Sequence, residues 1–447
     1  MQFHEDRPAT RHLRIVGATP GRIVRFPRAR PPRVAPADLL HELFEARVDE
    51  RFSAPAVAAG RRTVTYLELD RYANRVARHL WARGVRRGSR VAILLRRSAT
   101  AYGAILGVLK SGAACIPLEP SEPPDRVEYV LEDSGATALL TTSALGRRHG
   151  GFRGQVVLVD SDRKLIAAES RARLPRDLVR VDPNDLCHVT YDFDLDRTPK
   201  GVMIEHRSAC HLARVAERTF GVRPWDRVYQ GSPLHADGSI QEIWLAFHAG
   251  ATLVAPTARM ERAAGRSLCN RLAKAQVTVL SCTPSRLATL PREVPSIRLL
   301  ILRGGEVSDQ LVARWARADR RLVNTYGRAE STVMTTYADL QPGRPVTVGR
   351  PFPGCRVYVV DEDLGFVRCG RIGEICIGGA GVARGYLGLP AETSARFVQD
   401  PFASGGSDAR MYRTGDLGRI DASGNLEYHG RAAGWRSDAR LPDGSLS

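Results

Sequence analysis

The sequence has no hydrophobic run long enough to cross a membrane. A transmembrane helix needs about 20 consecutive apolar residues, and polar or charged residues interrupt every apolar stretch of this 447-residue chain before that length. The N-terminal stretch MQFHEDRPATRHLRIVG has basic residues but no apolar core, which is not the pattern of a secretory signal. Both absences predict a cytoplasmic protein with no membrane partner.

Closely spaced cysteine pairs are also absent. None of the eight cysteines lies in a C-x-x-C pair, and most of them lie within apolar runs. A cysteine metal site or a redox motif needs such spacing, whereas isolated cysteines in apolar runs are typical of buried free thiols in a reduced compartment. We therefore expect no cysteine metal site.

Aromatic residues are scarce, at 6% of the chain, and acidic residues are outnumbered by basic ones, 48 to 66. The resulting net charge of +18 could attract nucleic acid. However, the surplus is spread along the chain, arginine greatly outnumbers lysine, and no RNP-like or zinc-finger pattern is present. The composition therefore predicts no nucleic-acid partner.

Two stretches without periodicity flank the rest of the chain. Residues 1–36 are rich in arginine and proline, which predicts a flexible tail. Residues 432–447 have neither helical nor strand periodicity, and we interpret them as a second, non-homologous tail. The part between them is too long for one compact core, which predicts two or three subdomains.

Helix and strand patterns alternate from residue 38 to about residue 305. Residues 38–52 and 64–84 have apolar residues at helical spacing. Short apolar runs predict strands at 90–95, 113–118, 136–142, 154–160, 187–191, 251–256, 277–284 and 297–305. This alternation predicts an α/β fold in which helices cover parallel sheets. After about Pro345, short strands separated by turns predict a small β-rich subdomain.

Seven segments together carry a specific resemblance, although each alone would be a weak signal. They are VTYLEL (64–69), VLKSGAACIPLEP (108–120), PKGVMIEH (199–206), SPLHADGSIQEIW (232–244), NTYGRAEST (324–332), GEICIGGAGVARGYL (373–387) and YRTGDLGR (412–419). In this order and at this spacing, the chain resembles the adenylation domains of nonribosomal peptide synthetases, within the adenylate-forming (AMP-binding) superfamily. The resemblance covers about residues 37–431.

The resemblance implies a fold and a reaction. The fold is the N-terminal core of the adenylate-forming enzymes, with two helix-covered, mostly parallel sheets (37–180 and 181–344) and a small distorted β-barrel (345–431). In the reaction, an amino acid and ATP give an aminoacyl-AMP and pyrophosphate, and the thiol of a carrier protein then takes the acyl group. Here the carrier and its phosphopantetheine arm would be supplied in trans.

The resemblance also implies a nucleotide and metal site. Tyr326 matches the residue that packs on adenine, and Asn324 and Gly327 complete its turn. Asp416 matches the carboxylate that binds the ribose hydroxyls, and Arg431 matches a further ribose contact. The other implied members are Gly304 and Gly305 at the nucleotide, Lys200 and Thr198 at the end of the phosphate loop, and Glu330 as the Mg²⁺ ligand. After Gly327, Arg328 and Ala329 replace the proline and threonine of the family.

Asp237 matches the aspartate that holds the α-ammonium group of an amino-acid substrate. A turn aspartate before Gly238 is the alternative interpretation. By the same matching, the remaining pocket residues are Gly238, Gln241, Ser281, Leu302, Gly304, Thr325, Val333 and Met334. Gln241 and Ser281 indicate a partly polar pocket, and Ala236 replaces the usual aromatic residue beside Asp237.

The phosphate loop departs most from the family, which has a run of serine, threonine and glycine here. Residues 191–201 read YDFDLDRTPKG, so every glycine before Pro199 is lost and Asp192, Asp194 and Asp196 bring three carboxylates. Two unit charges ~5 Å apart interact by about 3 kcal/mol at an effective dielectric constant near 20. The loop therefore predicts weakened ATP binding, which replacement of the aspartates by Thr, Gly and Thr should improve.

Calcium binding is an alternative interpretation of the same acidic loop. An EF-hand loop starting at Asp192 needs glycine at its sixth position and glutamate at its twelfth, where this chain has Arg197 and Met203. A solvated acidic loop is therefore favoured over a calcium site.

The sequence beyond Arg431 is the second departure. Family members have a hinge aspartate and then a subdomain with a catalytic lysine, whereas Ala433 stands at the hinge position and no such lysine follows. A frameshift or premature stop is one hypothesis, which the downstream DNA read in all frames would test.

Three functions remain open. They are amino-acid adenylation that is impaired or needs a partner, a catalytically inactive homologue that binds a nucleotide or a protein, and an acyl-CoA or aryl-acid ligase. Asp237 argues against the third, because a carboxylate suits an ammonium group.

Overall fold

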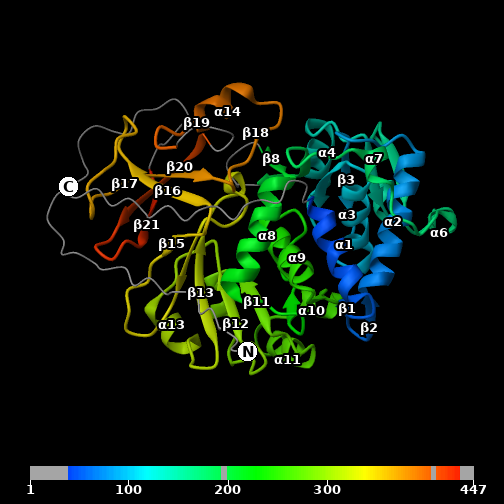
Figure 1. Ribbon diagram of the computed structural model, residues 1–447. Helices are drawn as coiled ribbons and strands as arrows, with labels where there is room; N and C mark the ends of the chain where they lie inside the picture. The colour runs from blue at the N-terminus through cyan, green and yellow to red at the C-terminus, as the bar shows by residue number, and fades with distance from the viewer. Residues whose placement is uncertain (1–38, 193–198, 404–408, 433–447) are drawn as a thin grey trace, which may run out of the picture.

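The computed structural model describes residues 39–192, 199–403 and 409–432, which form three sheets and the helices that cover them (Figure 1). The predicted mixed α/β fold with largely parallel sheets is confirmed. The predicted strands are found within one to three residues of their expected bounds, because each is a short apolar run buried on both faces.

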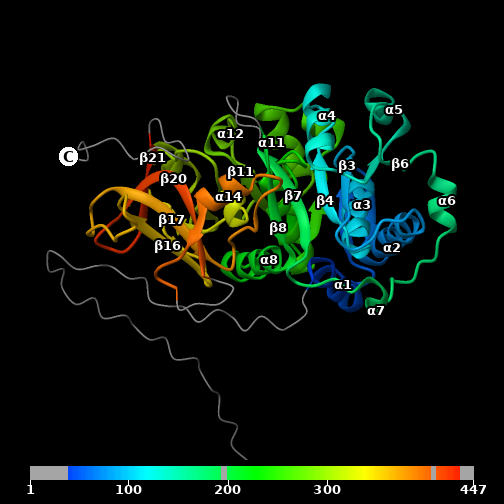
Figure 2. The same cartoon turned by 90° about the horizontal axis from the view of Figure 1, so that it is seen from above.

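The first sheet has seven strands in the order β18-β8-β7-β4-β3-β5-β6. They are β18 (Gly385–Tyr386), β8 (Lys200–Glu205), β7 (Leu186–Asp192), β4 (Ala114–Leu118), β3 (Arg90–Leu94), β5 (Ala138–Thr141) and β6 (Gln155–Leu158). From β7 to β6 the neighbouring strands are parallel, while β8 and β18 pair antiparallel at one edge. Figure 2 shows β8, β7, β4 and β3 side by side.

The second sheet has nine strands in the order β15-β14-β13-β12-β11-β9-β10-β1-β2. They are β15 (Arg350–Pro351), β14 (Thr336–Asp339), β13 (Arg321–Tyr326), β12 (Leu299–Leu302), β11 (Val279–Cys282), β9 (Arg227–Tyr229), β10 (Thr252–Val254), β1 (Pro55–Ala59) and β2 (Arg62–Thr65). The six strands from β13 to β1 are parallel, and the strands at both edges are antiparallel.

A layer of helices lies between these two sheets (Figure 1). It contains α1 (Leu40–Arg51), α2 (Tyr66–Ala82), α3 (Ala99–Lys110), α8 (His206–Phe220) and α9 (Asp237–Ala249). The largest apolar cluster joins these helices to both sheets, since it includes Ile93 of β3 and Ile301 of β12. The outer faces carry further helices, including α4 (Pro124–Asp133) on the first sheet and α11 (Gly265–Lys274) and α13 (Asp309–Trp315) on the second.

The predicted helix over 64–84 begins later than its apolar periodicity indicates. Val64 and Thr65 belong to β2, and α2 begins at Tyr66. The Thr65 hydroxyl accepts from the amide of Glu68, and the Glu68 carboxylate accepts from the amide of Thr65 at 2.8 Å. This reciprocal pair satisfies free amides of the first turn and therefore fixes the start of the helix.

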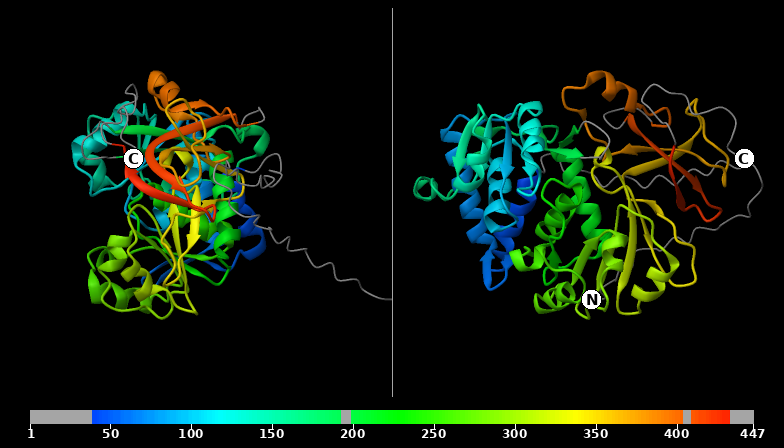
Figure 3. Two further views of the ribbon diagram at one scale, coloured as in Figure 1. Left: turned by 90° about the vertical axis from the view of Figure 1, so that its left-hand side faces the viewer. Right: turned by 180° about the vertical axis from the view of Figure 1, so that it is seen from behind.

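The third sheet is antiparallel and has five strands, which lie beside the β13–β15 edge of the second sheet (Figure 3). They are β16 (Cys355–Val360), β17 (Gly373–Gly379), β19 (Phe397–Gln399), β20 (Arg410–Ile420) and β21 (Leu426–Arg431). The first half of β20 pairs with β19 and its second half with β21. Helix α14 (Pro390–Arg396) connects this sheet to β18 of the first sheet. The loop that follows β13 thus lies where all three sheets come close.

Candidate active site

Tyr326 and Asp416 meet although they are 90 positions apart in the chain. The Tyr326 hydroxyl donates a 2.7 Å hydrogen bond to Asp416 Oδ2. Tyr326 ends β13, and Asp416 lies in β20, where its carboxylate is fully buried. Burial and the nearby Asp416 charge raise the pKa of Tyr326 well above its usual value, so the phenol stays protonated as a donor.

Arg328 occupies the same carboxylate with two further hydrogen bonds. Its Nε donates to Asp416 Oδ2 at 2.9 Å, and its Nη2 pairs with Asp416 Oδ1. Burial would lower the pKa of Arg328, but the hydrogen bonds and charge of Asp416 raise it above the usual range. Such a bidentate pair between a guanidinium and a carboxylate is among the stronger polar contacts in proteins. Both oxygens of Asp416 are therefore engaged within the protein.

Glu330 lies two residues beyond Arg328, in a 3₁₀ turn at Ala329–Ser331. The hydroxyl of Tyr386, from β18, donates to Glu330 Oε1 at 2.7 Å. The Lys200 ammonium lies 5.4 Å from the centre of the Tyr386 ring and forms an ion pair with Glu392 of α14. The predicted lysine and the predicted metal ligand are thus brought to the same tyrosine.

The remaining nucleotide residues shape the backbone. Asn324 is buried, and its Nδ2 donates to the Thr347 carbonyl at 2.9 Å. A Cβ on Gly327 would lie 2.4 Å from the Val333 carbonyl oxygen, so only glycine fits this close approach. Gly304 (φ +65°) and Gly305 form the turn after β12. Arg431 is exposed at the end of β21, in register with Asp416.

The turn after Glu330 holds two residues in the left-handed region. Thr332 has φ +55° and Val333 has φ +72°, which is unusual for a β-branched side chain. The Thr332 hydroxyl donates to the Gly381 carbonyl at 2.6 Å, and both side chains are buried. Such strain persists only where the surroundings fix the backbone, and it is commonly found at functional sites.

The predicted substrate residues lie around the start of α9 and the carboxyl ends of β11, β12 and β13. Asp237 and Gly238 open α9, and Gln241 follows one turn later. Ser281 and Thr325 are buried on their strands, and Thr325 donates to the Leu302 carbonyl at 2.8 Å. Val333 and Met334 belong to the apolar cluster between α9 and the sheet.

Leu302 is the member of this set that the structure does not bring to the α9 side. Side chains alternate along a strand, and Ile301 belongs to the cluster beneath α9 whereas Leu302 belongs to the cluster on the other face of the sheet. Its role in the site therefore stays a prediction that its side-chain packing does not support.

Thr198, Asp194, Asp196 and Arg197 lie outside the described residues, as does the side chain of Asp192. The predictions made for the phosphate loop and for calcium therefore stay predictions. Within the described ranges, no cluster of three His, Cys, Asp or Glu side chains is arranged to hold a metal ion. In the same part of the chain, no helix is both long and apolar enough to cross a membrane.

The sequence did not identify four side chains that contact the predicted residues. Tyr386 and Glu392 contact Glu330 and Lys200, and Arg303 packs against Gly238. Arg328 stands out in the sequence only as a departure from the family. A charged residue in place of a proline, next to a predicted site residue, was the available signal for Arg328. Tyr386 stands in one of the seven motifs, but nothing in the sequence pairs it with Glu330.

Comparison with known proteins gives a consistent result. The family model described as AMP-binding enzyme matches residues 44–387. A linear gramicidin synthase from Brevibacillus parabrevis is 39% identical over 393 residues, which are 88% of this chain and 5% of that protein. Phosphinothricin tripeptide synthetase PhsC from Streptomyces viridochromogenes is 38% identical over 394 residues, 88% of this chain and 36% of that protein.

Solved structures agree with these relatives. The nonribosomal peptide synthetase FmoA3, in its form with α-methyl-L-serine-AMP bound, superposes with a TM-score of 0.80 at 31% identity. The match covers 90% of this chain and 46% of that one, and a form with AMPPNP bound gives the same TM-score. The chain thus spans less than half of each of these proteins. It belongs to the AMP-binding enzyme family, and its relatives there are adenylation domains of nonribosomal peptide synthetases.

Proposed function

We propose that the chain adenylates an amino acid. The substrate carboxylate oxygen forms a bond to the α-phosphorus of ATP, and the bond to the β-phosphate oxygen breaks, which releases pyrophosphate. The observation that carries this proposal is the contact between Tyr326 and Asp416. It places an aromatic ring beside a buried carboxylate, and these are the two groups that a nucleoside needs for its base and its ribose hydroxyls.

Glu330 fits a magnesium ion that is bound mainly through its ligand. Mg²⁺ keeps several waters and is commonly held by one or two carboxylates together with substrate phosphates. Glu330 is half-buried and has one oxygen hydrogen-bonded to Tyr386, which fixes the direction of the carboxylate. Bound with ATP, the ion would neutralise phosphate charge.

The other residues have positioning roles in this proposal. Asp416 would accept from the ribose hydroxyls, and Asp237, at the start of α9, would hold the substrate ammonium group. The Lys200 ammonium would exchange its ion pair with Glu392 for a phosphate oxygen. This transfer depends mainly on orientation and charge neutralisation.

Arg328 favours a second candidate function. Its guanidinium fills both oxygens that the ribose hydroxyls would use, so a nucleotide has to displace a charge-assisted pair. A catalytically inactive homologue that binds a nucleotide weakly, or binds a protein, is consistent with this contact. An impaired adenylating enzyme is consistent with it as well.

Calorimetric titration of AMP and MgATP separates these candidates. The wild-type chain is compared with Asp416→Asn and Arg328→Gln, and Arg317→Gln, whose surface side chain pairs with Glu293 and Asp319, is the control. We expect AMP to bind, to bind more tightly to Arg328→Gln, and to bind about tenfold more weakly or worse to Asp416→Asn. Amino-acid-dependent pyrophosphate release then tests catalysis.

Failure of both nucleotides to bind the wild-type chain and Arg328→Gln would reject the adenylating function. Binding of AMP without binding of MgATP would indicate that the triphosphate is excluded. A carrier protein supplied in trans, a cytoplasmic location and the division at residues 37–180, 181–344 and 345–431 are parts of the same proposal. Addition of candidate carrier proteins to the release assay tests the first of them.

A further inference from the structure

The contacts of Arg303 concern the substrate that the proposed site would accept. Arg303 follows β12, and alternation along the strand directs it to the α9 side, as for Ile301. A Cβ built on Gly238 would lie 2.0 Å from the Arg303 guanidinium carbon, so the guanidinium lies directly on the backbone of α9. Its Nη1 is 3.8 Å from Asp237 Oδ1, and its Nη2 donates to the Ser232 hydroxyl.

Polar atoms without partners lie on the same side of the sheet. Both amide atoms of Gln241, the Ser281 hydroxyl and the Arg303 Nε are buried without a hydrogen-bond partner. Gln241 is three residues after Gly238 on α9, and therefore on a similar face of the helix. Ser281 pairs in register with Ile301 on β12. Buried polar groups are nearly always hydrogen-bonded, so these groups indicate a polar ligand.

The charges narrow the chemistry of that ligand. Asp237 has Arg303 as its ion-pair partner, and its side chain is 32% exposed. If a substrate ammonium group takes Asp237, it arrives beside a guanidinium of the same sign, and Arg303 loses its compensating charge. Glu242 does not replace that charge directly, because its carboxylate is hydrogen-bonded to the Ser232 hydroxyl and amide at 2.7 Å and 3.1 Å.

We infer that Arg303 is a specificity-determining residue and that the proposed site takes an amino acid whose side chain ends in a carboxylate. The carboxylate pairs with the guanidinium, while the ammonium group pairs with Asp237. The two charges of the substrate thereby replace one internal ion pair with two. Gln241 and Ser281 supply further donors to the carboxylate. This inference rests on the proposed adenylating function.

Non-hydrolysable analogues of the aminoacyl-AMP test this inference on the whole chain. Sulfamoyl adenosine is the parent probe, and its glutamyl, glutaminyl, aspartyl and asparaginyl derivatives differ only in the side chain. By calorimetry, we expect one acidic derivative to bind at least about tenfold more tightly than its amide counterpart, which is the effect of one charge-assisted hydrogen bond. Arg303→Gln should abolish this preference, and the control Arg317→Gln should keep it.

Arg303→Lys retains the charge and provides a second variant if Arg303→Gln does not fold by circular dichroism. It should retain part of the preference, because lysine lacks the planar fork of donors. Equal binding of acidic and amide derivatives to the wild-type chain would overturn the inference, and so would a preference that persists in Arg303→Gln. If the parent probe itself does not bind, the proposed function fails and this inference fails with it.

Discussion

At the scale of single residues, the Arg328–Asp416 pair combines a structural and a functional role. A buried carboxylate is costly unless a charge and hydrogen bonds compensate it, and Arg328 supplies both. The family position has proline, which has no charge to offer. The same contact that stabilises this chain therefore competes with the proposed nucleotide.

Arg328→Gln should lower the free energy of unfolding by about 3 kcal/mol, because it leaves Asp416 buried without its cation. The double variant Arg328→Gln/Asp416→Asn should lose less, since no buried charge remains. Urea denaturation of both variants and of the control Arg317→Gln gives the comparison. A double variant that is as unstable as the sum of the two single variants would show that the pair is not coupled.

Glu242 predicts a distinct pH dependence. It is fully buried, and burial raises its pKa to about 7, although the charge of Arg303 and the hydrogen bonds from Ser232 oppose this rise. The folded state therefore holds the proton more tightly than the unfolded state does. The contribution of this group to stability is full below about pH 4.5 and falls as the pH rises to about 7.

Glu242→Gln should remove this pH dependence while keeping an acceptor for Ser232. Between pH 5 and pH 8, the wild-type chain should lose up to about 3 kcal/mol more unfolding free energy than the variant. Urea denaturation at both pH values measures the difference and cancels the contribution of histidines common to both proteins. An identical pH dependence in the two proteins would show that Glu242 does not titrate in this range.

At the scale of elements, the apolar periods and the helix cap account for what the sequence predicted. The strands near 90, 114, 139 and 300 are short runs of aliphatic residues, and such runs have few alternatives to a buried parallel strand. The hairpin of β1 and β2 was not predicted, because its residues PAVAAGRRTVT combine weak strand formers with a turn and precede a strong helix. Only its pairing with β10 identifies it.

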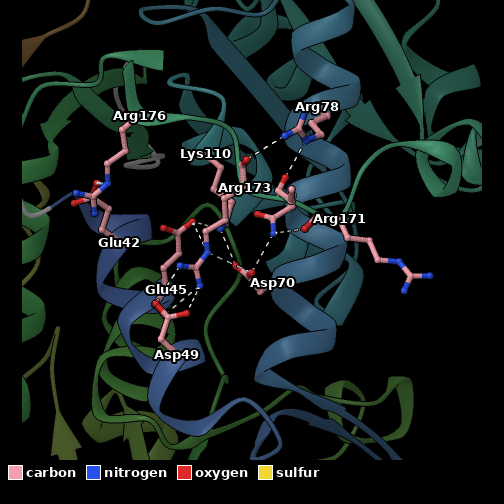
Figure 4. A network of polar contacts seen from close by, with 11 residues as sticks. Glu42, Glu45, Asp49, Asp70, Arg78, Lys110, Arg171, Arg173 and Arg176 are labelled. Carbon is pink, nitrogen blue, oxygen red and sulfur yellow. Dashed lines mark hydrogen bonds and ion pairs between the residues drawn. The ribbon is translucent and has the colours of Figure 1, made fainter. Parts of the chain in front are cut away.

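The segment 169–176 is an element held by charges rather than by apolar contacts (Figure 4). Arg173 pairs with Asp49 at 2.6 Å and lies 3.6 Å from Asp70, and carbonyls of the segment accept from Arg78 and Asn74 of α2. Beneath it, buried Lys110 pairs with Asp70 at 2.7 Å and with Glu45. The outer contacts are part-exposed and the inner ones are buried.

This layering predicts unequal effects of two substitutions. Lys110→Met should lower the unfolding free energy by roughly 3–5 kcal/mol, because it leaves two buried carboxylates without their ammonium group. Arg173→Ala should cost about 1 kcal/mol or less, since its side chain is 35% exposed. Hydrogen exchange should show faster exchange confined to 169–176 in Arg173→Ala, and equal effects of both changes would refute the layering.

At the scale of the whole molecule, the site depends on contacts that sequence patterns do not encode. The seven motifs placed Tyr326, Glu330 and Asp416 in one site, and the structure brings Tyr326 and Asp416 into contact. The partners that now occupy the predicted residues, Arg328 and Arg303, are long charged side chains. Their direction is decided by burial and by the nearest opposite charge, and both of these depend on the tertiary fold.

The same long-range packing predicts that the described part of the chain unfolds as one unit. The largest apolar cluster runs from Leu40 to Tyr412 and includes residues of all three sheets. Glu205, at the end of β8, is 7% exposed and accepts from Arg384 Nε at 2.9 Å, while Arg410 of β20 donates to the Arg384 carbonyl at 2.8 Å. These contacts connect the first sheet to the third.

Glu205→Gln should therefore shift the single urea transition to lower denaturant without changing its slope. We expect a loss of about 2 kcal/mol, because the substitution leaves Arg384 and Arg207 without their shared carboxylate. The transition is followed by both circular dichroism and tryptophan fluorescence, and Arg317→Gln is again the control. Two separate transitions, or a reduced slope in Glu205→Gln alone, would mean that the third sheet unfolds independently, and the proposed nucleotide site would then open before the rest of the protein unfolds.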